Sequence, residues 1–138
     1  MDCLFCKIIK NEISSEKIYE DGDVLAFMDI GPVNNGHVLV IPKEHVENYL
    51  SASDEMLAKC NSVIKKITPV ILEAVRSSGW NLGVNSGKVS GQVIFHLHFH
   101  IMPRFENDGL RLFPANEDAK LKVLEVAEKI RQYLKSEN

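Results

Sequence analysis

The longest regular pattern in the chain is a stripe of apolar residues at helical spacing in its middle. Apolar side chains recur every three or four residues from Met56 to Val75, and the polar residues 51–54 before them are suited to cap a helix. Pro69 is expected to bend this helix and Gly79 to end it. A second stripe predicts a C-terminal helix over residues 116–134, with an apolar face of Leu121, Leu124, Ala127, Ile130 and Leu134.

Shorter apolar runs rich in β-branched and aromatic residues predict five strands. They cover Lys17–Glu20, Val24–Asp29, His37–Ile41, Asn81–Asn85 and Ile94–Met102, and a short helix is expected at residues 4–11. Residues 21–23, 30–36 and 86–92 have the composition of turns and loops. Because short loops join neighbouring strands, antiparallel pairing is expected. The sequence therefore predicts an α+β domain with helices on one face of a mostly antiparallel sheet.

Composition narrows the class of protein. The chain has 138 residues, 45% of them hydrophobic and 25% charged, which is typical of a single globular domain over residues 1–138. Its net charge of -3 lacks the basic signature of a general nucleic-acid binder, although local donors can still bind a small anion. No apolar run approaches the roughly 20 residues that cross a bilayer, and no signal peptide is visible. We therefore expect a cytoplasmic protein without a nucleic-acid or membrane partner.

Three of the five histidines alternate with apolar residues in the last predicted strand. Because strand side chains alternate between faces, His96, His98 and His100 are expected to share one face. The opposite, core-facing side would carry Phe95, Leu97, Phe99 and Ile101. A plain solvent-facing side is the alternative, but other polar residues would serve that purpose equally well. Three imidazoles together indicate chemistry near neutral pH.

Strand geometry limits what these histidines can bind together. His96 and His100 are expected to lie about 13 Å apart along the strand, whereas zinc binds nitrogen at about 2.1 Å. One metal could therefore take an adjacent pair but not all three. At least one of the histidines must have another role.

The loop before the histidines has the composition of an anion site. Gly87 and Gly91 allow backbone N–H groups to come close to a ligand, and Ser86, Ser90 and Gln92 add polar side chains. Hairpin loops are often rich in glycine without any ligand. Directly before a histidine cluster, the loop indicates that a phosphate-like group is bound over the imidazoles.

The segment His96–Met102 resembles the His-x-His-x-His motif of the histidine triad superfamily of nucleotide hydrolases and transferases. Other segments are similar to parts of that family in the same order, over about residues 3–105: residues 3–9, 25–30, 36–45, 81–87 and 91–92. The resemblance implies a five-stranded antiparallel sheet with flanking helices, and a homodimer with a continuous ten-stranded sheet. It also implies substrates in which a leaving group is joined to the α-phosphate of a purine nucleoside monophosphate.

The resemblance also assigns roles to individual residues. It implies that His98 is the nucleophile, that His100 contacts the phosphate and that His37 supports the site. Its implied substrate contacts are Asn85, Gly91, Gln92 and Val93 at the phosphate, Asp29 at the ribose, and Phe5, Phe27 and Ile30 at the base. Ordinary core packing is the alternative for the three apolar residues of the base pocket. Val93 stands where many members carry Ser or Thr, and valine cannot donate a hydrogen bond to a leaving group.

A zinc site is expected at the N-terminus. Cys3 and Cys6 form a C-x-x-C pair, which alone is only half of a zinc site. The resemblance to prokaryotic family members adds His45 and His96, which would complete a closed structural Zn²⁺ site. Unmetallated cysteines are the alternative. Cys60 falls within the helical stripe and is expected to be a small buried hydrophobe.

Three functions remain open from the sequence. The first is hydrolysis or transfer of nucleotide conjugates, such as phosphoramidates or dinucleoside polyphosphates, through a nucleotidyl-histidine intermediate on His98. The second is a metallohydrolase in which zinc on His96 and His98 activates water. The third is a nucleotide-binding module without turnover.

Overall fold

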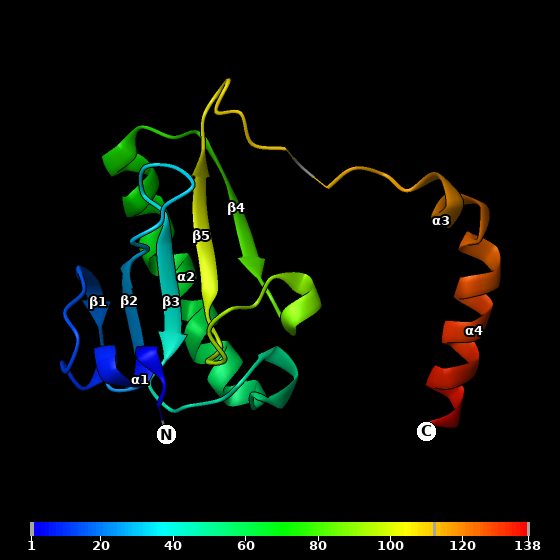
Figure 1. Cartoon of the computed structure of the whole chain (residues 1–138), viewed down its shortest axis with the longest axis horizontal. Helices are drawn as coiled ribbons and strands as arrows, with labels where there is room; N and C mark the ends of the chain where they lie inside the picture. Colours follow the sequence, from blue (N-terminus) through cyan, green and yellow to red (C-terminus); the bar gives the residue numbers. More distant parts are fainter. Residues whose placement is uncertain (1, 112, 138) are drawn as a thin grey trace. The chain divides into compact units, whose positions relative to one another are not determined.

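The computed structural model describes residues 2–111 and 113–137. Its elements in chain order are α1 (Leu4–Ile9), β1 (Lys17–Glu20), β2 (Val24–Met28), β3 (Val38–Pro42), α2 (Asp54–Val75), β4 (Gly79–Val84), β5 (Phe99–Arg104), α3 (Glu117–Leu121) and α4 (Val123–Ser136) (Figure 1). One compact unit ends at Asp108 and a second begins at Gly109. The second unit contains α3 and α4. The single domain expected over residues 1–138 stays a prediction.

The first unit is built on one five-stranded sheet with the order β1-β2-β3-β5-β4. Every neighbouring pair of strands is antiparallel. This confirms the predicted α+β class with a five-stranded antiparallel sheet. The edge strands of this sheet are β1 and β4, and the histidine-bearing β5 lies between β3 and β4.

Helices cover both faces of the sheet, so the expectation of helices on one face is wrong. Val24 and Val40 belong to a core that includes the buried side of α2, whereas Leu25 and Ile41 pack with Phe5 of α1. The strands β2 and β3 are buried at nearly every position. Such continuous apolar runs are typical of strands covered on two sides.

The predicted strand Ile94–Met102 is wrong in its first half. β5 begins at Phe99, because its pairing with β3 reaches only from Ile101 to Phe99. Before this point, the backbone N–H of Leu97 donates instead to the carbonyl of Val46 at 2.7 Å. This long-range hydrogen bond draws residues 94–98 out of the ladder. Phe95 is consequently 43% exposed rather than part of the core.

The three histidines therefore do not lie together on one solvent-exposed face of a strand. His96 and His98 precede β5 and are buried, and only His100 lies within the strand. The ring of Phe5 from α1 stands edge-on to both buried imidazoles. His96 and His98 are therefore buried because α1 covers them. The alternating pattern of the predicted strand contained no sign of this contact.

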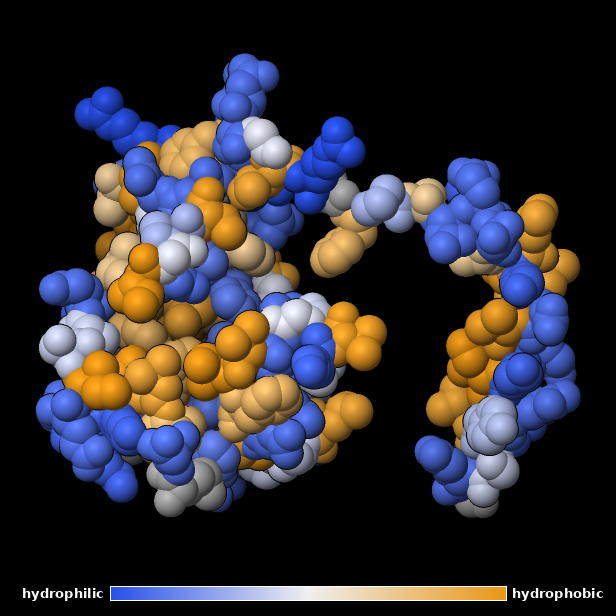
Figure 2. All heavy atoms as spheres, in the orientation of Figure 1, coloured by the Kyte–Doolittle hydropathy of each residue, from blue (hydrophilic) through white to orange (hydrophobic). Residues whose placement is uncertain are grey.

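Two helix boundaries also differ from the expected ones. α2 is capped as predicted, by Ser53, but its C-cap is Arg76 in a left-handed conformation with φ 58°. Gly79 begins β4 instead of ending the helix. The single C-terminal helix is two, α3 and α4, which are separated at Lys122. Figure 2 shows apolar side chains gathered along one side of this segment and polar ones along another. None of the described helices is long and apolar enough to cross a membrane.

Candidate functional site

A cavity of about 310 Å³ lies beside His98 and His100. It is lined by residues of α1, β2, β3 and β5 and of the loops before β1, after β2 and before β5. Most of the predicted site residues meet here: Phe5, Phe27, Asp29, Ile30, Asn85, Gly91, Val93, His98 and His100. Ile13, Ser14, Ser15 and Ile94 also line it but were not predicted. They lie in irregular segments, where no periodicity assigns a side chain to a face.

The backbone fixes the protonation of the His98 ring. Its Nδ1 lies 2.7 Å from the carbonyl oxygen of His96, which can only accept, so Nδ1–H is the donor. The lone pair of the neutral ring is then on Nε2. Burial lowers the pKa of His98, although the hydrogen bond to His96 opposes this shift. The site therefore presents an unprotonated imidazole nitrogen at neutral pH.

A chain of hydrogen bonds places the proton of the His100 ring on Nε2, whereas that of His98 is on Nδ1. The backbone N–H of Val33 donates to Nδ1 of His37 at 3.1 Å, so the proton of the neutral His37 ring is on Nε2. That nitrogen lies 2.9 Å from Nδ1 of His100 and donates to it. The proton of the neutral His100 ring must therefore be on Nε2. The ring centres of His98 and His100 are 5.0 Å apart. The acceptor Nε2 of His98 and the donor Nε2–H of His100 therefore belong to neighbouring rings.

His37 contacts the site through His100 and is not a lining residue of the cavity. Its Nε2 lies 3.5 Å from a carboxylate oxygen of Asp29. The other oxygen of Asp29 accepts the backbone N–H of Gly31 at 2.8 Å, which fixes the orientation of this carboxylate. Asp29, His37 and His100 are close enough to share a metal ion. The 2.9 Å between the two imidazole nitrogens is nevertheless a hydrogen-bond distance, shorter than the roughly 3.3 Å between nitrogens on one tetrahedral zinc.

The burial of His100 makes stability depend on pH. Burial, aided by the nearby His98 and His37, lowers its pKa from 6.5 to about 4. The unfolded chain therefore takes up this proton first as pH falls. The contribution is fully present above about pH 6.5 and is lost as pH falls towards 4, by up to about 3 kcal/mol. Urea unfolding at pH 7, 5.5 and 4.5 is expected to show this decline, and His100→Asn is expected to flatten part of it. An unchanged slope in the variant would contradict the assignment.

The loop before the histidines is held by Gln92. Its buried side chain accepts the backbone N–H of Gly87 at 2.8 Å and donates to the carbonyl of Glu47 at 2.8 Å. Gln92 is therefore used to shape the loop, and it is not among the lining residues of the cavity. Gly91 has φ 102°, which favours glycine, and lies beside Asn85. Val93 is 80% exposed and Ile30 is 98% exposed, so both lie on the open side of the cavity.

The predicted metal ligands converge in a second cluster. Cys3, Cys6, His45 and His96 have ligand atoms within 4.8 Å of one another. Cys6 Sγ lies 3.5 Å from His45 Nδ1 and 3.6 Å from His96 Nδ1, and Cys3 Sγ lies 3.5 Å from His96 Nδ1. The two Nδ1 atoms are 3.2 Å apart. Tetrahedral zinc would place sulfur and nitrogen ligands about 3.6 Å apart and two nitrogens about 3.3 Å apart. The four side chains therefore fit a zinc ion as they stand.

The other nitrogen of His96 is also arranged as in a metal site. Nε2 lies 2.8 Å from the carbonyl oxygen of Pro42, to which it donates, so Nδ1 is free to bind a metal. Burial lowers the pKa of His96, which keeps the ring neutral. His98 belongs to neither metal-capable cluster in the described part of the chain. The motif is thus divided between two sites.

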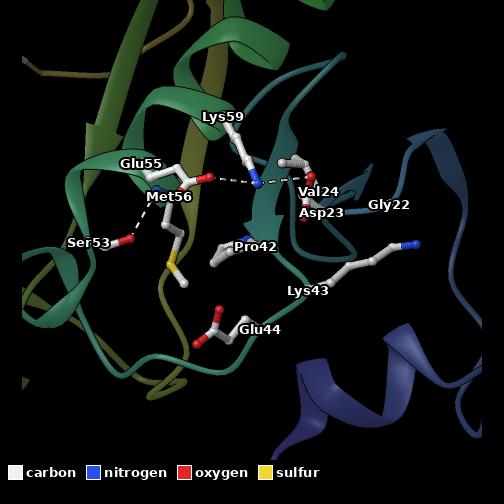
Figure 3. Close-up of a pocket in the computed structure, with 10 residues that line it drawn as sticks. All are labelled: Gly22, Asp23, Val24, Pro42, Lys43, Glu44, Ser53, Glu55, Met56 and Lys59. Atoms are coloured by element: carbon white, nitrogen blue, oxygen red, sulfur yellow. Dashed lines mark hydrogen bonds and ion pairs between the residues drawn. The ribbon is translucent and has the colours of Figure 1, made fainter.

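Another cavity, of about 230 Å³, lies between α2 and the sheet (Figure 3). Its lining includes Lys59, which pairs with Asp23 at 3.2 Å and with Glu55 at 3.4 Å. None of the described residues that line it is histidine or cysteine. Because its central cation is already compensated, we place the candidate chemistry in the cavity beside His98 and His100.

Sequence comparisons identify proteins that are similar to this chain. The HIT domain family model matches residues 10–107. The chain is 43% identical over 109 residues to the adenylylsulfatase HINT3 of Arabidopsis thaliana, which covers 79% of this chain and 55% of that protein. It is 41% identical over 104 residues to the adenosine 5'-monophosphoramidase hnt1 of Schizosaccharomyces pombe, which covers 75% of each chain.

Solved structures share the fold. A protein from Streptococcus mutans UA159 superposes with a TM-score of 0.87 at 41% identity, over 96% of this chain and 85% of that chain. A Zn-bound histidine triad family protein from Mycobacterium smegmatis has a TM-score of 0.75 at 34% identity, over 92% of this chain and 98% of that chain. Since the family model covers more than half of the sequence and these relatives match most of it, the chain belongs to the HIT domain family.

Proposed function

We propose that this protein hydrolyses purine nucleoside monophosphate conjugates at the α-phosphate through a covalent intermediate on His98. The observation that carries the proposal is the pairing of an imidazole acceptor, His98 Nε2, with an imidazole donor, His100 Nε2–H, beside one cavity. The names of the two similar proteins support this class, because both are hydrolases of adenylyl compounds.

In the first step, the lone pair of His98 Nε2 forms a bond to the α-phosphorus. The bond from phosphorus to the leaving group breaks, and the leaving group departs with the bonding electron pair. The resulting ring is cationic, and its Nδ1–H continues to donate to the carbonyl of His96. The Nε2–H of His100 donates to a phosphoryl oxygen and stabilises the charge that develops there.

In the second step, water attacks the phosphorus from the position that the leaving group has left. A phosphorus–oxygen bond forms, the bond to Nε2 breaks, and its electron pair returns to the His98 ring. The water proton passes to solvent and the nucleoside monophosphate is released. Asp29, whose carboxylate is held by Gly31 at the cavity, would accept hydrogen bonds from the ribose hydroxyls. Phe5 and Phe27 form an apolar wall for the base.

A substrate panel tests this function. Adenylylsulfate, adenosine 5'-phosphoramidate and a dinucleoside polyphosphate are incubated with the protein, and AMP release is measured. We expect release from at least one of them. The side chain of Val93 offers no hydrogen-bond donor on the open side of the cavity, which favours leaving groups that depart as stable anions. If the protein binds AMP but releases none from the panel, the binding-module alternative is correct.

We infer that Cys3, Cys6, His45 and His96 hold a structural zinc ion. The distances within this cluster support it, and so does the Zn-bound state of the similar Mycobacterium smegmatis protein. Zinc would tie α1 to the segment before β5. Four protein ligands complete a tetrahedral shell and leave no position for a reactive water. This argues against the metallohydrolase alternative, which also requires His98 as a ligand.

We propose that the chain forms a homodimer through the edge strand β4. Its exposed face carries Trp80, Leu82 and Val84, and as a sheet edge it offers unpaired backbone groups. The other edge, β1, also exposes Ile18, but it carries the charged Lys17 and Glu20 at its ends, which are suited to solvent. A β4–β4 contact would join two five-stranded sheets into one of ten strands.

Leu82→Glu is expected to convert the dimer to a monomer, because a charge would be buried opposite its own copy. Light scattering coupled to size exclusion measures the mass. Leu50→Glu, at a site 89% exposed and outside the sheet, is the matched control and is expected to remain dimeric. A monomeric wild type, or a dimeric Leu82→Glu protein, would contradict the β4 interface.

A further inference from the structure

Two buried side-chain polar atoms in the described part of the chain have no hydrogen-bond partner in the protein: His100 Nε2 and Ser15 Oγ. Both residues line the same cavity. A buried polar group without a partner destabilises the fold, so each such group calls for an explanation. For His100, the phosphate of the proposed substrate supplies the partner. Ser15 has no role in that chemistry.

The surroundings of Ser15 are those of a binding pocket for a flat, largely apolar group. Phe5 and Phe27 meet edge to face with ring centres 5.4 Å apart, and Ile13 adds an aliphatic wall. Ser15 lies between α1 and β1, and its carbonyl accepts the backbone N–H of Lys17 at 3.2 Å. Its backbone is thereby held, while its buried hydroxyl has no hydrogen-bond partner in a cavity lined largely by apolar side chains.

A planar heteroaromatic ring suits both the apolar walls of this pocket and its unpaired hydroxyl. Its faces are apolar enough to lie against aromatic and aliphatic side chains, while its edge carries nitrogen or oxygen atoms that need hydrogen bonds. A serine hydroxyl can donate or accept, so it can pair with either kind of edge atom. The cavity of about 310 Å³ lies within the range of small-ligand sites.

We propose that the hydroxyl of Ser15 hydrogen-bonds an edge heteroatom of the nucleobase and so contributes to base selection. This inference rests on the proposed function, because the base enters the apolar part of the cavity only if the phosphate lies at His98 and His100. Ser15 touches neither the reacting phosphorus nor the leaving group. It is therefore a specificity-determining residue rather than a catalytic one.

Calorimetric binding of AMP and of ribose 5-phosphate tests the inference with the full, zinc-loaded chain. Ser15→Ala is expected to bind AMP roughly tenfold more weakly than wild type, which is the effect of losing one buried hydrogen bond. Its affinity for ribose 5-phosphate, which has no base, is expected to be unchanged. The melting temperature of the ligand-free variant should be equal or higher, because an unpaired buried hydroxyl has been removed. Ser62→Ala, which changes an exposed serine of α2 outside this cavity, is the matched control and should bind AMP as wild type does.

The possible outcomes distinguish the role of Ser15 from the proposed function on which it rests. Equal AMP affinity in wild type and Ser15→Ala would overturn the role of Ser15 and leave the nucleotide site standing. Equal weakening of AMP and ribose 5-phosphate would overturn it as well, since the effect would then be structural. A wild-type protein that binds neither compound would overturn the proposed function itself.

Discussion

Replacing His98 with glycine is expected to lower turnover of an adenylyl substrate by about 10⁴-fold or more, with AMP affinity changed by less than about threefold. The variant lacks the nitrogen that bonds to phosphorus in the proposed mechanism. The cavity retains its apolar walls, the donor on His100 and the loop held by Gln92. Turnover and binding should therefore separate. Steady-state kinetics and AMP titration of the same preparation measure both.

Added imidazole provides a control for the His98→Gly variant. A free imidazole that enters the space of the missing ring can attack the phosphorus in its place, so partial recovery of turnover is expected. Added imidazole is expected to leave the turnover of the wild-type protein unchanged, because its own His98 ring already lies beside the cavity. A His98→Gly protein that cleaves at the wild-type rate would contradict the covalent mechanism.

Replacing Cys3 with serine is expected to remove zinc and to lower the melting temperature by about 10 °C or more. Cys3 is the N-cap of α1, and its Sγ faces both His96 Nδ1 and the backbone N–H of Cys6. Loss of the metal would release α1 from the segment before β5. Metal analysis and calorimetry measure the two effects. Cys60→Ala is the matched control, because this buried cysteine lies in α2, and it should retain one zinc per chain.

Chelation separates a structural zinc from a catalytic one. At a temperature where the chelated protein is still folded, turnover per active site should persist, because His98 Nε2 requires no metal. Complete loss of turnover in a chelated but folded protein would favour the metallohydrolase alternative instead.

The sequence predicts the strands well because their apolar runs are local signals. Four of the five strands, β1 to β4, appear within two residues of their expected bounds, and Ser53 caps the central helix as expected. The histidine spacing likewise identifies the site, since no common structural need explains three imidazoles at every second residue. The C-x-x-C pair and His45 meet His96 as the family resemblance implies.

The parts that sequence reasoning missed depend on contacts between distant segments. The segment before β5 leaves the sheet because Leu97 bonds to Val46, and no local pattern contains that pairing. The helix α1 covers the second face of the sheet, although its six residues give little periodicity to interpret. Ser15 stands in a loop, where its polarity is unremarkable until the structure shows that its hydroxyl is buried and unpaired.

His96 connects the metal-ligand cluster with the cavity beside His98 through both its side chain and its backbone. The predicted strand did not show this direct connection. Its side-chain Nδ1 lies in the metal cluster, while its backbone carbonyl holds the Nδ1–H of His98. A metal bound at His96 would thereby help to position the residue that orients the nucleophile. The proposed metal site and the proposed nucleophile are thus connected through one residue rather than through a shared coordination shell.

The central claim is that His98 becomes covalently nucleotidylated. Rapid acid-free quenching of wild-type protein during turnover of an adenylyl substrate, followed by proteolysis and mass spectrometry, tests it directly. We predict one adenylyl group on the peptide that contains His98, localised to that residue and absent from the His98→Gly protein. Turnover at a normal rate with no adduct at any time point, or with the adduct on another residue, would contradict the account.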